Sequence, residues 1–128
     1  MVDNLPLNAE KAARLLDGNK ELYRELIKTV EATLSERIDH LQKALKTRNA
    51  EDLEMYAHQL KGALRAVAAD EGCALLEQLE ICGKQANFRT ATTLWPHVEP
   101  TVQRFLEVFR TGDWTREFAR RSEVQPRS

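Results

Sequence analysis

The residues best suited to chemistry in this sequence of 128 residues stand close together in one periodic segment. On a helical wheel that advances about 100° per residue, His58 lies opposite the apolar positions of the segment, so we expect it to face water. Gly62 and Arg65 follow four and seven residues later on the same stripe, and Lys61 lies along one edge of it. The spacing therefore predicts an exposed imidazole accompanied by two cations and a bare stretch of helix backbone.

Gly62 is the unusual member of this stripe. A glycine inside a helix costs about 1 kcal/mol relative to alanine, and on an exposed side no buried neighbour needs the space. We therefore expect it to admit a molecule that approaches from outside. A neutral imidazole nitrogen is a nucleophile, and a cation such as Lys61 disfavours imidazolium and attracts phosphoryl oxygens. The pattern indicates a histidine that accepts and passes on a phosphoryl group, with Met55, Gln59, Gly62 and Arg65 contacting the partner.

Simpler interpretations of these residues remain open. An isolated histidine on a polar helix face is usually an ordinary surface residue, and Lys61 and Arg65 could form a solvated face that pairs with Glu54. Glu54 could instead steady the second ring nitrogen of the exposed histidine, although a contribution to solubility is its simpler role. His40 and His97 have no comparable neighbours, and three scattered histidines do not make a zinc site.

The elements that must position these residues are predicted to be helices. Apolar residues recur every three or four positions, and only five glycines and four prolines interrupt them. A short arm is followed by four long helices with short connections, so the expected fold is all-α, an antiparallel four-helix bundle with a short amino-terminal helical arm. The expected helices cover residues 8–16, 22–45, 50–69, 74–83 and 88–109.

Polar residues and prolines mark the expected helix ends. Three asparagines are expected to cap helices: Asn8, Asn49 and Asn87. Residues 17–19 should stop the arm, and residues 70–72 should mark the end of the helix at 50–69 or a tight corner. Gly83 should weaken the last turn of the next helix. Pro96 and Pro100 each remove a backbone donor, so a kink or a break is expected there.

Composition narrows the classes of function. The 19 basic and 20 acidic residues nearly cancel, so no overall field recruits nucleic acid or an anionic membrane. Cys73 and Cys82 point to roughly opposite faces of one expected helix and are expected to be small buried or half-buried side chains in a reducing compartment. No signal peptide or stretch of 18 apolar residues is found. We therefore expect a cytoplasmic protein without membrane insertion.

The length supports one domain with one core. Residues 1–111 are expected to form the bundle, and residues 112–128 a carboxyl-terminal tail or an extension of the last helix. The arginines at positions 116, 120 and 121 form a local basic cluster in this tail. Aromatic residues are not interleaved with it as nucleic-acid binding requires, so we expect no nucleic-acid partner.

The run Ala57-His58-Gln59-Leu60-Lys61-Gly62 resembles the signature of histidine-containing phosphotransfer (HPt) domains. In that signature alanine-histidine, a variable residue and leucine-lysine-glycine surround the phosphorylated histidine. The resemblance extends from about residue 7 to residue 109 and includes the leucine-glutamate pairs at 76–77 and 79–80. It implies a four-helix bundle with an amino-terminal arm. His58 would be the phosphoacceptor and Lys61 its electrostatic partner, and Gly62 would leave the space in which a partner receiver domain approaches the histidine.

The sequence departs from the HPt pattern at two positions. Many members have a small polar residue where Ala66 stands, which leaves the partner preference of this chain open. Many have a glycine where Ala68 stands. If position 68 serves close helix packing, an alanine there is a small change.

The resemblance also implies the partners. They would be receiver domains of response regulators or hybrid kinases, together with a sensor histidine kinase. Magnesium is expected in the partner receiver, while this chain should hold no metal or cofactor of its own. It is expected to be a monomeric carrier and not an enzyme, since no glycine-rich phosphate loop or acidic metal cluster is found. A stand-alone protein and a domain of a hybrid sensor kinase both fit.

A helical adaptor is the rival hypothesis. Such a protein would keep the bundle and the docking surface and block a receiver or kinase without carrying phosphate. The sequence disfavours it, because a blocker needs neither the exposed histidine nor Gly62.

Overall fold

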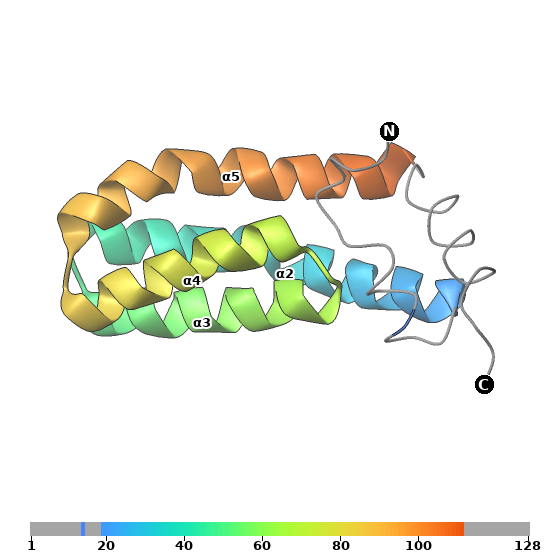
Figure 1. Ribbon diagram of the computed structural model, residues 1–128, viewed down its shortest axis with the longest axis horizontal. Coiled ribbons are helices and arrows are strands. Elements are labelled where there is room, and N and C mark those ends of the chain that lie inside the picture. The colour runs from blue at the N-terminus through green and yellow to red at the C-terminus, as the bar shows by residue number, and fades with distance from the viewer. Residues whose placement is uncertain (1–13, 15–18, 112–128) are drawn as a thin grey trace.

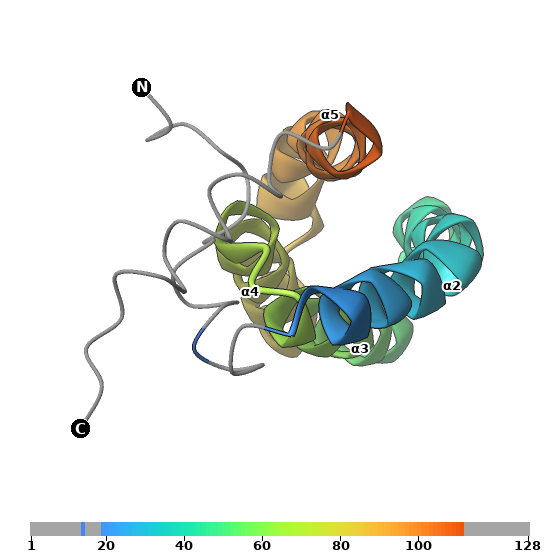
Figure 2. The same ribbon diagram turned by 90° about the vertical axis from the view of Figure 1, so that its right-hand side faces the viewer.

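The computed structural model describes residue 14 and residues 19–111 of the chain. Four helices make up this part, and each runs antiparallel to the one before it (Figure 1). They are α2 (Lys20–Lys46), α3 (Ala50–Ala66), α4 (Asp70–Gln85) and α5 (Phe88–Thr111). Viewed from one end, α3 lies between α2 and α4 (Figure 2). The predicted all-α antiparallel four-helix bundle is confirmed, whereas the predicted arm and the tail at residues 112–128 lie outside the described residues.

The first described helix, α2, is turned slightly from its predicted orientation. It begins after Asn19, whose side-chain oxygen accepts a hydrogen bond from the Leu22 N–H over 3.0 Å. The apolar residues that recur every three or four positions in this segment begin at Leu22, which predicts Leu22 in the core. Its side chain is instead 45% exposed, and Tyr23 is fully buried. The Tyr23 hydroxyl donates a hydrogen bond to the Val67 carbonyl over 2.8 Å. Because its polar group is satisfied, the large ring can lie in the core, and burial raises the pKa of Tyr23 well above its ordinary value.

The connection between α3 and α4 comes earlier than the sequence pattern predicts. Residues 70–72 do not end a helix; they form the first turn of α4, where the helix dipole favours their two acidic side chains. The chain turns at Ala68, which has a left-handed φ of 59°. The Ala69 N–H then donates back to the Leu64 carbonyl over 2.9 Å. Position 68 therefore requires a left-handed backbone conformation in addition to a small side chain for close packing.

The last helix, α5, is uninterrupted, so the predicted alternative of a break at Pro96 or Pro100 is wrong. Figure 1 shows that the helix bends in its amino-terminal part. Both prolines are exposed, so the carbonyls that lose a partner can face water. Asn87 caps α5 by accepting from the Thr90 N–H over 3.1 Å, and Asn49 caps α3 in the same way, both as predicted. Buried side chains along the described part of α5 hold it on the bundle: Phe88, Ala91, Val98, Val102, Phe105 and Leu106.

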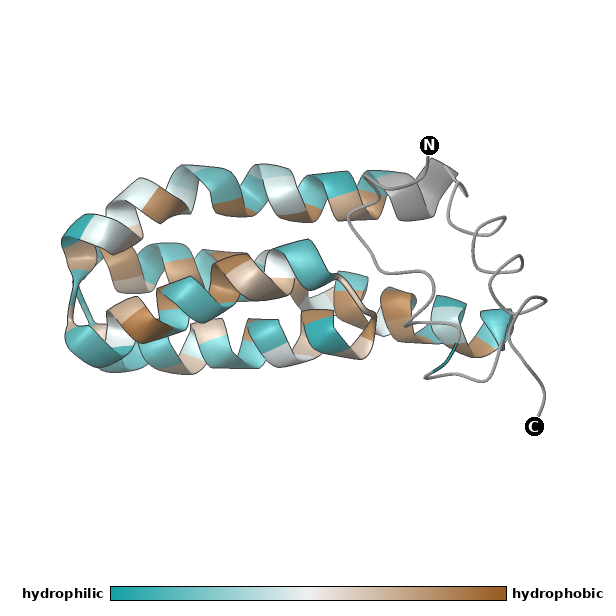
Figure 3. Ribbon diagram, viewed as in Figure 1, coloured by the Kyte–Doolittle hydropathy of each residue, from teal (hydrophilic) through white to brown (hydrophobic). Residues whose placement is uncertain are grey.

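The core lies along the bundle axis. Hydrophobic residues lie on the sides of the helices that face one another, and hydrophilic residues lie on the outer sides (Figure 3). Cys82 is buried and Cys73 half-buried, as predicted. Tyr56 and Trp95 pack at the margin of the core. None of the helices in the described part of the chain is long and apolar enough to span a membrane.

Candidate functional site

His58 lies on the outer side of α3 because the residues around it face inward. The apolar positions of α3 are buried against the other helices: Leu53, Ala57, Leu60 and Leu64. The His58 side chain is consequently 68% exposed. It is not without a partner, since its Nδ1 lies 3.0 Å from Oε2 of Glu80 on α4. From the sequence, Glu54 is the candidate partner of this ring nitrogen, but in the structure the partner is Glu80.

Glu80 joins the histidine to Lys61. Its side chain is buried, and its Oε1 lies 2.6 Å from the Lys61 Nζ. Lys61 also approaches Glu77 Oε1 at 3.5 Å. The sequence pattern places Lys61 at the exposed edge of the stripe, but the residue is only 9% exposed and its ammonium faces α4. Position 61 borders the apolar side of α3, so the aliphatic stem packs between the helices and the charge meets a carboxylate there.

The ion pair between Lys61 and Glu80 fixes the charge of both groups. The hydrogen bond to Glu80 raises the pKa of Lys61, despite the opposing effect of burial. The hydrogen bond from Lys61, with a smaller contribution from His58, lowers the pKa of Glu80, again against the effect of burial. Glu80 is therefore a carboxylate at neutral pH. A carboxylate only accepts hydrogen bonds, so a neutral His58 ring carries its proton on Nδ1 and keeps the lone pair of Nε2 available.

The exposed stripe around His58 is open, as predicted. Met55 is 43% exposed, and Gln59, Gly62 and Arg65 are also exposed. A Cβ atom added to Gly62 would meet no other heavy atom within 4 Å, so nothing within the described fold requires a glycine there. The geometry agrees with a surface left free for a partner, while the contact of these residues with a partner stays a prediction.

Gly83 brings the two helices of the site together. A Cβ atom at this position would lie 2.5 Å from the backbone N of Glu54 and 2.7 Å from its Cα. The glycine thus does more than weaken the last turn of α4, because it lets α4 approach the backbone of α3. This approach occurs one turn from Glu80, and it places the Glu80 carboxylate within hydrogen-bond distance of His58.

Sequence reasoning missed the roles of Glu80 and Gly83, although a signal was present. The buried side of α4 is formed by residues that recur at helical spacing: Gly72, Leu76, Leu79, Glu80, Cys82 and Gly83. A carboxylate within an otherwise apolar stripe predicts a buried partner of opposite charge. Ile81, which the pattern counts as apolar core, is 44% exposed.

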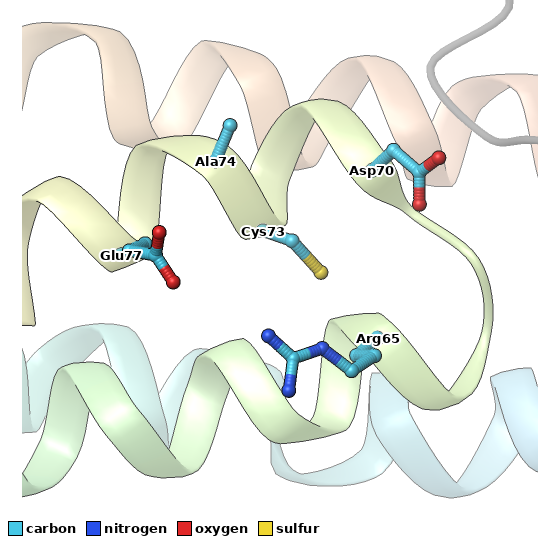
Figure 4. A pocket seen from close by; sticks show the side chains of 5 residues that line it. All are labelled: Arg65, Asp70, Cys73, Ala74 and Glu77. Atoms are coloured by element: carbon cyan, nitrogen blue, oxygen red, sulfur yellow. The ribbon is translucent and has the colours of Figure 1, made fainter.

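Arg65 lines a separate hollow between α3 and α4. The cavity measures about 260 Å³ and is lined by five residues: Arg65, Asp70, Cys73, Ala74 and Glu77. Figure 4 shows the Arg65 guanidinium pointing toward Cys73 and Glu77. The Cys73 thiol itself donates to the Lys61 carbonyl over 3.6 Å. The second predicted cation is therefore turned toward α4 and lines a hollow whose walls do not include His58.

The other two histidines lie away from this network. His40 stacks on Tyr56 with ring centroids 4.6 Å apart, and His97 is exposed on α5. Among residues 14 and 19–111, no three His, Cys, Asp or Glu side chains are grouped so that they could hold a metal ion.

Comparison with known proteins identifies the family. A family model described as the Hpt domain matches residues 25–110, a segment that contains His58, Lys61 and Glu80 and nearly the whole bundle. No curated protein and no solved structure gives a significant match. The match covers well over half of the chain, and both the four-helix bundle and the exposed histidine agree with it. The chain belongs to the Hpt domain family, whose members carry phosphoryl groups on histidine in the phosphorelays of two-component signalling.

Proposed function

We propose that His58 accepts a phosphoryl group from the aspartyl phosphate of one receiver domain and passes it to the aspartate of another. The observation that supports this most directly is the state of the ring. Glu80 engages Nδ1 at 3.0 Å, while the side chain stays 68% exposed. One nitrogen is thus held by the protein, and the other is left for chemistry with a partner.

The bonds that form and break in the transfer belong only to the imidazole and the phosphoryl donor. The lone pair of Nε2 attacks the phosphorus atom, and an N–P bond forms. The bond between phosphorus and the aspartyl oxygen breaks, and its electron pair leaves with the carboxylate. The Nδ1 proton stays in its hydrogen bond to Glu80, whose negative charge faces the positive charge that develops on the ring. Transfer to the next receiver reverses these steps.

Lys61 supports this chemistry through Glu80. Its ammonium lies 2.6 Å from Glu80 Oε1 and is nearly buried. In this position it keeps the carboxylate ionised and fixed in orientation, so we assign it the role of a positioning residue. The electrostatic support predicted for Lys61 then reaches the histidine indirectly.

The partner completes the active centre. The receiver supplies the magnesium ion and most of the stabilisation of the transition state. Gly62 leaves the space through which the receiver brings its aspartyl phosphate to the ring. The chain would then act as a carrier between receiver domains of response regulators or hybrid kinases, downstream of a sensor kinase, and would need no nucleotide of its own.

Labelling with radioactive phosphate tests this proposal. The full chain is incubated with a phosphorylated receiver and examined for acid-labile, base-stable label, which is expected on the wild type and absent from His58→Gln. His97→Gln, a change at an exposed histidine of α5, serves as the matched control and should be labelled normally. Label that persists in His58→Gln would refute the site. Absence of label with each of several receivers would favour the adaptor.

A further inference from the structure

Two lysines lie near the Glu80 carboxylate, and their environments differ. Lys61 meets Oε1 from within the groove between α3 and α4, and only 11% of its side chain is exposed. Lys84 lies one turn after Glu80 on α4, and its Nζ is 4.0 Å from Oε2, with 58% of the side chain exposed. That same Oε2 atom bonds His58 Nδ1. Lys84 is therefore the lysine that combines closeness to the carboxylate oxygen bound by the imidazole with access to solvent.

Lys61 is poorly placed to contact a phosphoryl group on the ring. Its ammonium has carboxylates at 2.6 Å and 3.5 Å, and moving it outward would leave the buried Glu80 without its main counter-charge. Breaking a buried pair in this way is strongly unfavourable. The Lys84 ammonium, by contrast, is mostly hydrated and at the outer limit of an ion pair. Its movement costs little, because exposed pairs contribute little to stability.

Arg65 is also less suitable. It lies seven residues from His58, which corresponds to about 10 Å along a helix axis. Its guanidinium points into the hollow toward Cys73 and Glu77 (Figure 4). The Lys84 ammonium, in contrast, lies near Glu80 Oε2, the same oxygen that contacts the His58 ring.

We infer that Lys84 is a catalytic residue, whose ammonium contacts the phosphoryl oxygens as the group moves onto or off His58. The inference rests on the proposed function of His58. Lys84 forms no bond to phosphorus and transfers no proton. It places a positive charge beside oxygens whose negative charge the imidazole alone does not balance, and its long side chain follows the group between donor and ring.

Two phosphoryl donors distinguish a contact of Lys84 with the phosphoryl group from a contact of Lys84 with the receiver surface. Phosphoramidate is small and does not use the receiver-binding surface, whereas a phosphorylated receiver does. If Lys84 contacts the phosphoryl group itself, Lys84→Gln should slow labelling of the full chain by both donors, by about tenfold, which corresponds to 1.36 kcal/mol in the barrier. Lys84→Arg should retain most of the rate. The matched control is Lys28→Gln, which removes an exposed lysine from α2 and should change neither rate.

The outcomes that overturn the inference are distinct. If only the receiver reaction slows, Lys84 contacts the receiver and not the phosphoryl group. If neither slows, Lys84 has no part in transfer. Lys84 could also act only through Glu80, and the double variant tests this. We expect Lys84→Gln to slow phosphoramidate labelling in a Glu80→Gln background as well, which would exclude such an indirect role. If Lys84→Gln has no effect in that background, Lys84 acts through Glu80 and the inference is wrong. Absence of label on the wild type would refute the function of His58 and that of Lys84 with it, whereas equal rates on a labelled wild type refute Lys84 alone.

Discussion

At the scale of residues, Glu80 is the centre of the site. It contacts His58 with one carboxylate oxygen and Lys61 with the other, at 3.0 Å and 2.6 Å. Such a carboxylate orients the imidazole and selects its tautomer, much as an outer carboxylate does for a histidine bound to a metal. The cost is a buried charge that depends on its partner. Stability and chemistry are therefore linked through the same ion pair.

The stability of the protein should depend on pH through this pair. The pKa of Glu80 falls below its ordinary 4.5 on folding, so its contribution is complete above pH 4.5 and is lost as the pH falls through the folded pKa. The pKa of Lys61 rises above its ordinary 10.5, so its contribution is complete below pH 10.5 and is lost as the pH rises through the folded pKa. The difference in unfolding free energy between wild type and Glu80→Gln should thus be largest between these two values.

Urea unfolding of the two proteins across this pH range measures that difference. Glu77→Gln is the matched control, because Glu77 approaches the same lysine at 3.5 Å but its side chain is 57% exposed, so its effect should be much smaller. A difference for Glu80→Gln that does not change with pH would mean that packing, and not the ion pair, is lost.

At the scale of elements, two glycines in helical segments have opposite functions. Gly83 lets α4 approach the backbone of α3, and Gly62 faces open space. Sequence alone does not separate them, because both interrupt a helix at the same cost in propensity. Only the packing of α3 against α4 shows which glycine the fold needs.

Substitution by alanine should distinguish these two glycines. Gly83→Ala places a Cβ atom 2.5–2.7 Å from the Glu54 backbone and should lower stability by about 1–2 kcal/mol, since overpacking exceeds the gain in helix propensity. Gly62→Ala should raise stability by up to about 1 kcal/mol. Urea denaturation measures both changes. Equal effects of the two substitutions would contradict the close approach of α4 at Gly83.

At the scale of the whole molecule, the site occupies one side of the bundle. The helices α3 and α4 supply every residue of the network around His58, and α2 and α5 complete the core that holds those two helices in place (Figure 2). The 68% exposure of the His58 side chain agrees with a partner reaching the imidazole without rearrangement of the four described helices. The approach is limited by what projects from the outer side of α3.

A long side chain at position 62 should obstruct that approach. Gly62→Gln is expected to keep the fold, because the position is exposed and glutamine favours helix more than glycine. Transfer from a phosphorylated receiver should slow by at least about tenfold, whereas labelling by phosphoramidate should change little. Thermal unfolding checks the fold, and the ratio of the two rates measures the obstruction. An unchanged rate with the receiver would show that position 62 lies outside the contact.

The sequence predicted most of this architecture, and its failures have a common cause. Helical periodicity placed His58 on the outer side of α3 and located all four described helices. It failed for Lys61, Glu80 and Gly83, because each takes its role from a neighbour on another helix, and a wheel drawn for a single helix contains no such neighbour. The prediction also placed the end of α3 too late. Ala68 adopts a left-handed conformation there, which an alanine in the sequence does not indicate.

The openness of the stripe has a consequence for how signalling routes diverge. Met55, Gln59 and Arg65 are exposed, and substitutions at such positions usually change stability by no more than about 0.5 kcal/mol. His58 and Lys61 both contact Glu80, so a substitution of Glu80 removes a partner from each of the other two. If the stripe contacts the receiver as proposed, a duplicated copy of this gene would acquire a new receiver by substitutions on the stripe alone and would keep the proposed phosphoryl chemistry. On that proposal, insulation between parallel pathways would be achieved on the exposed surface, without any change to the buried ion pair.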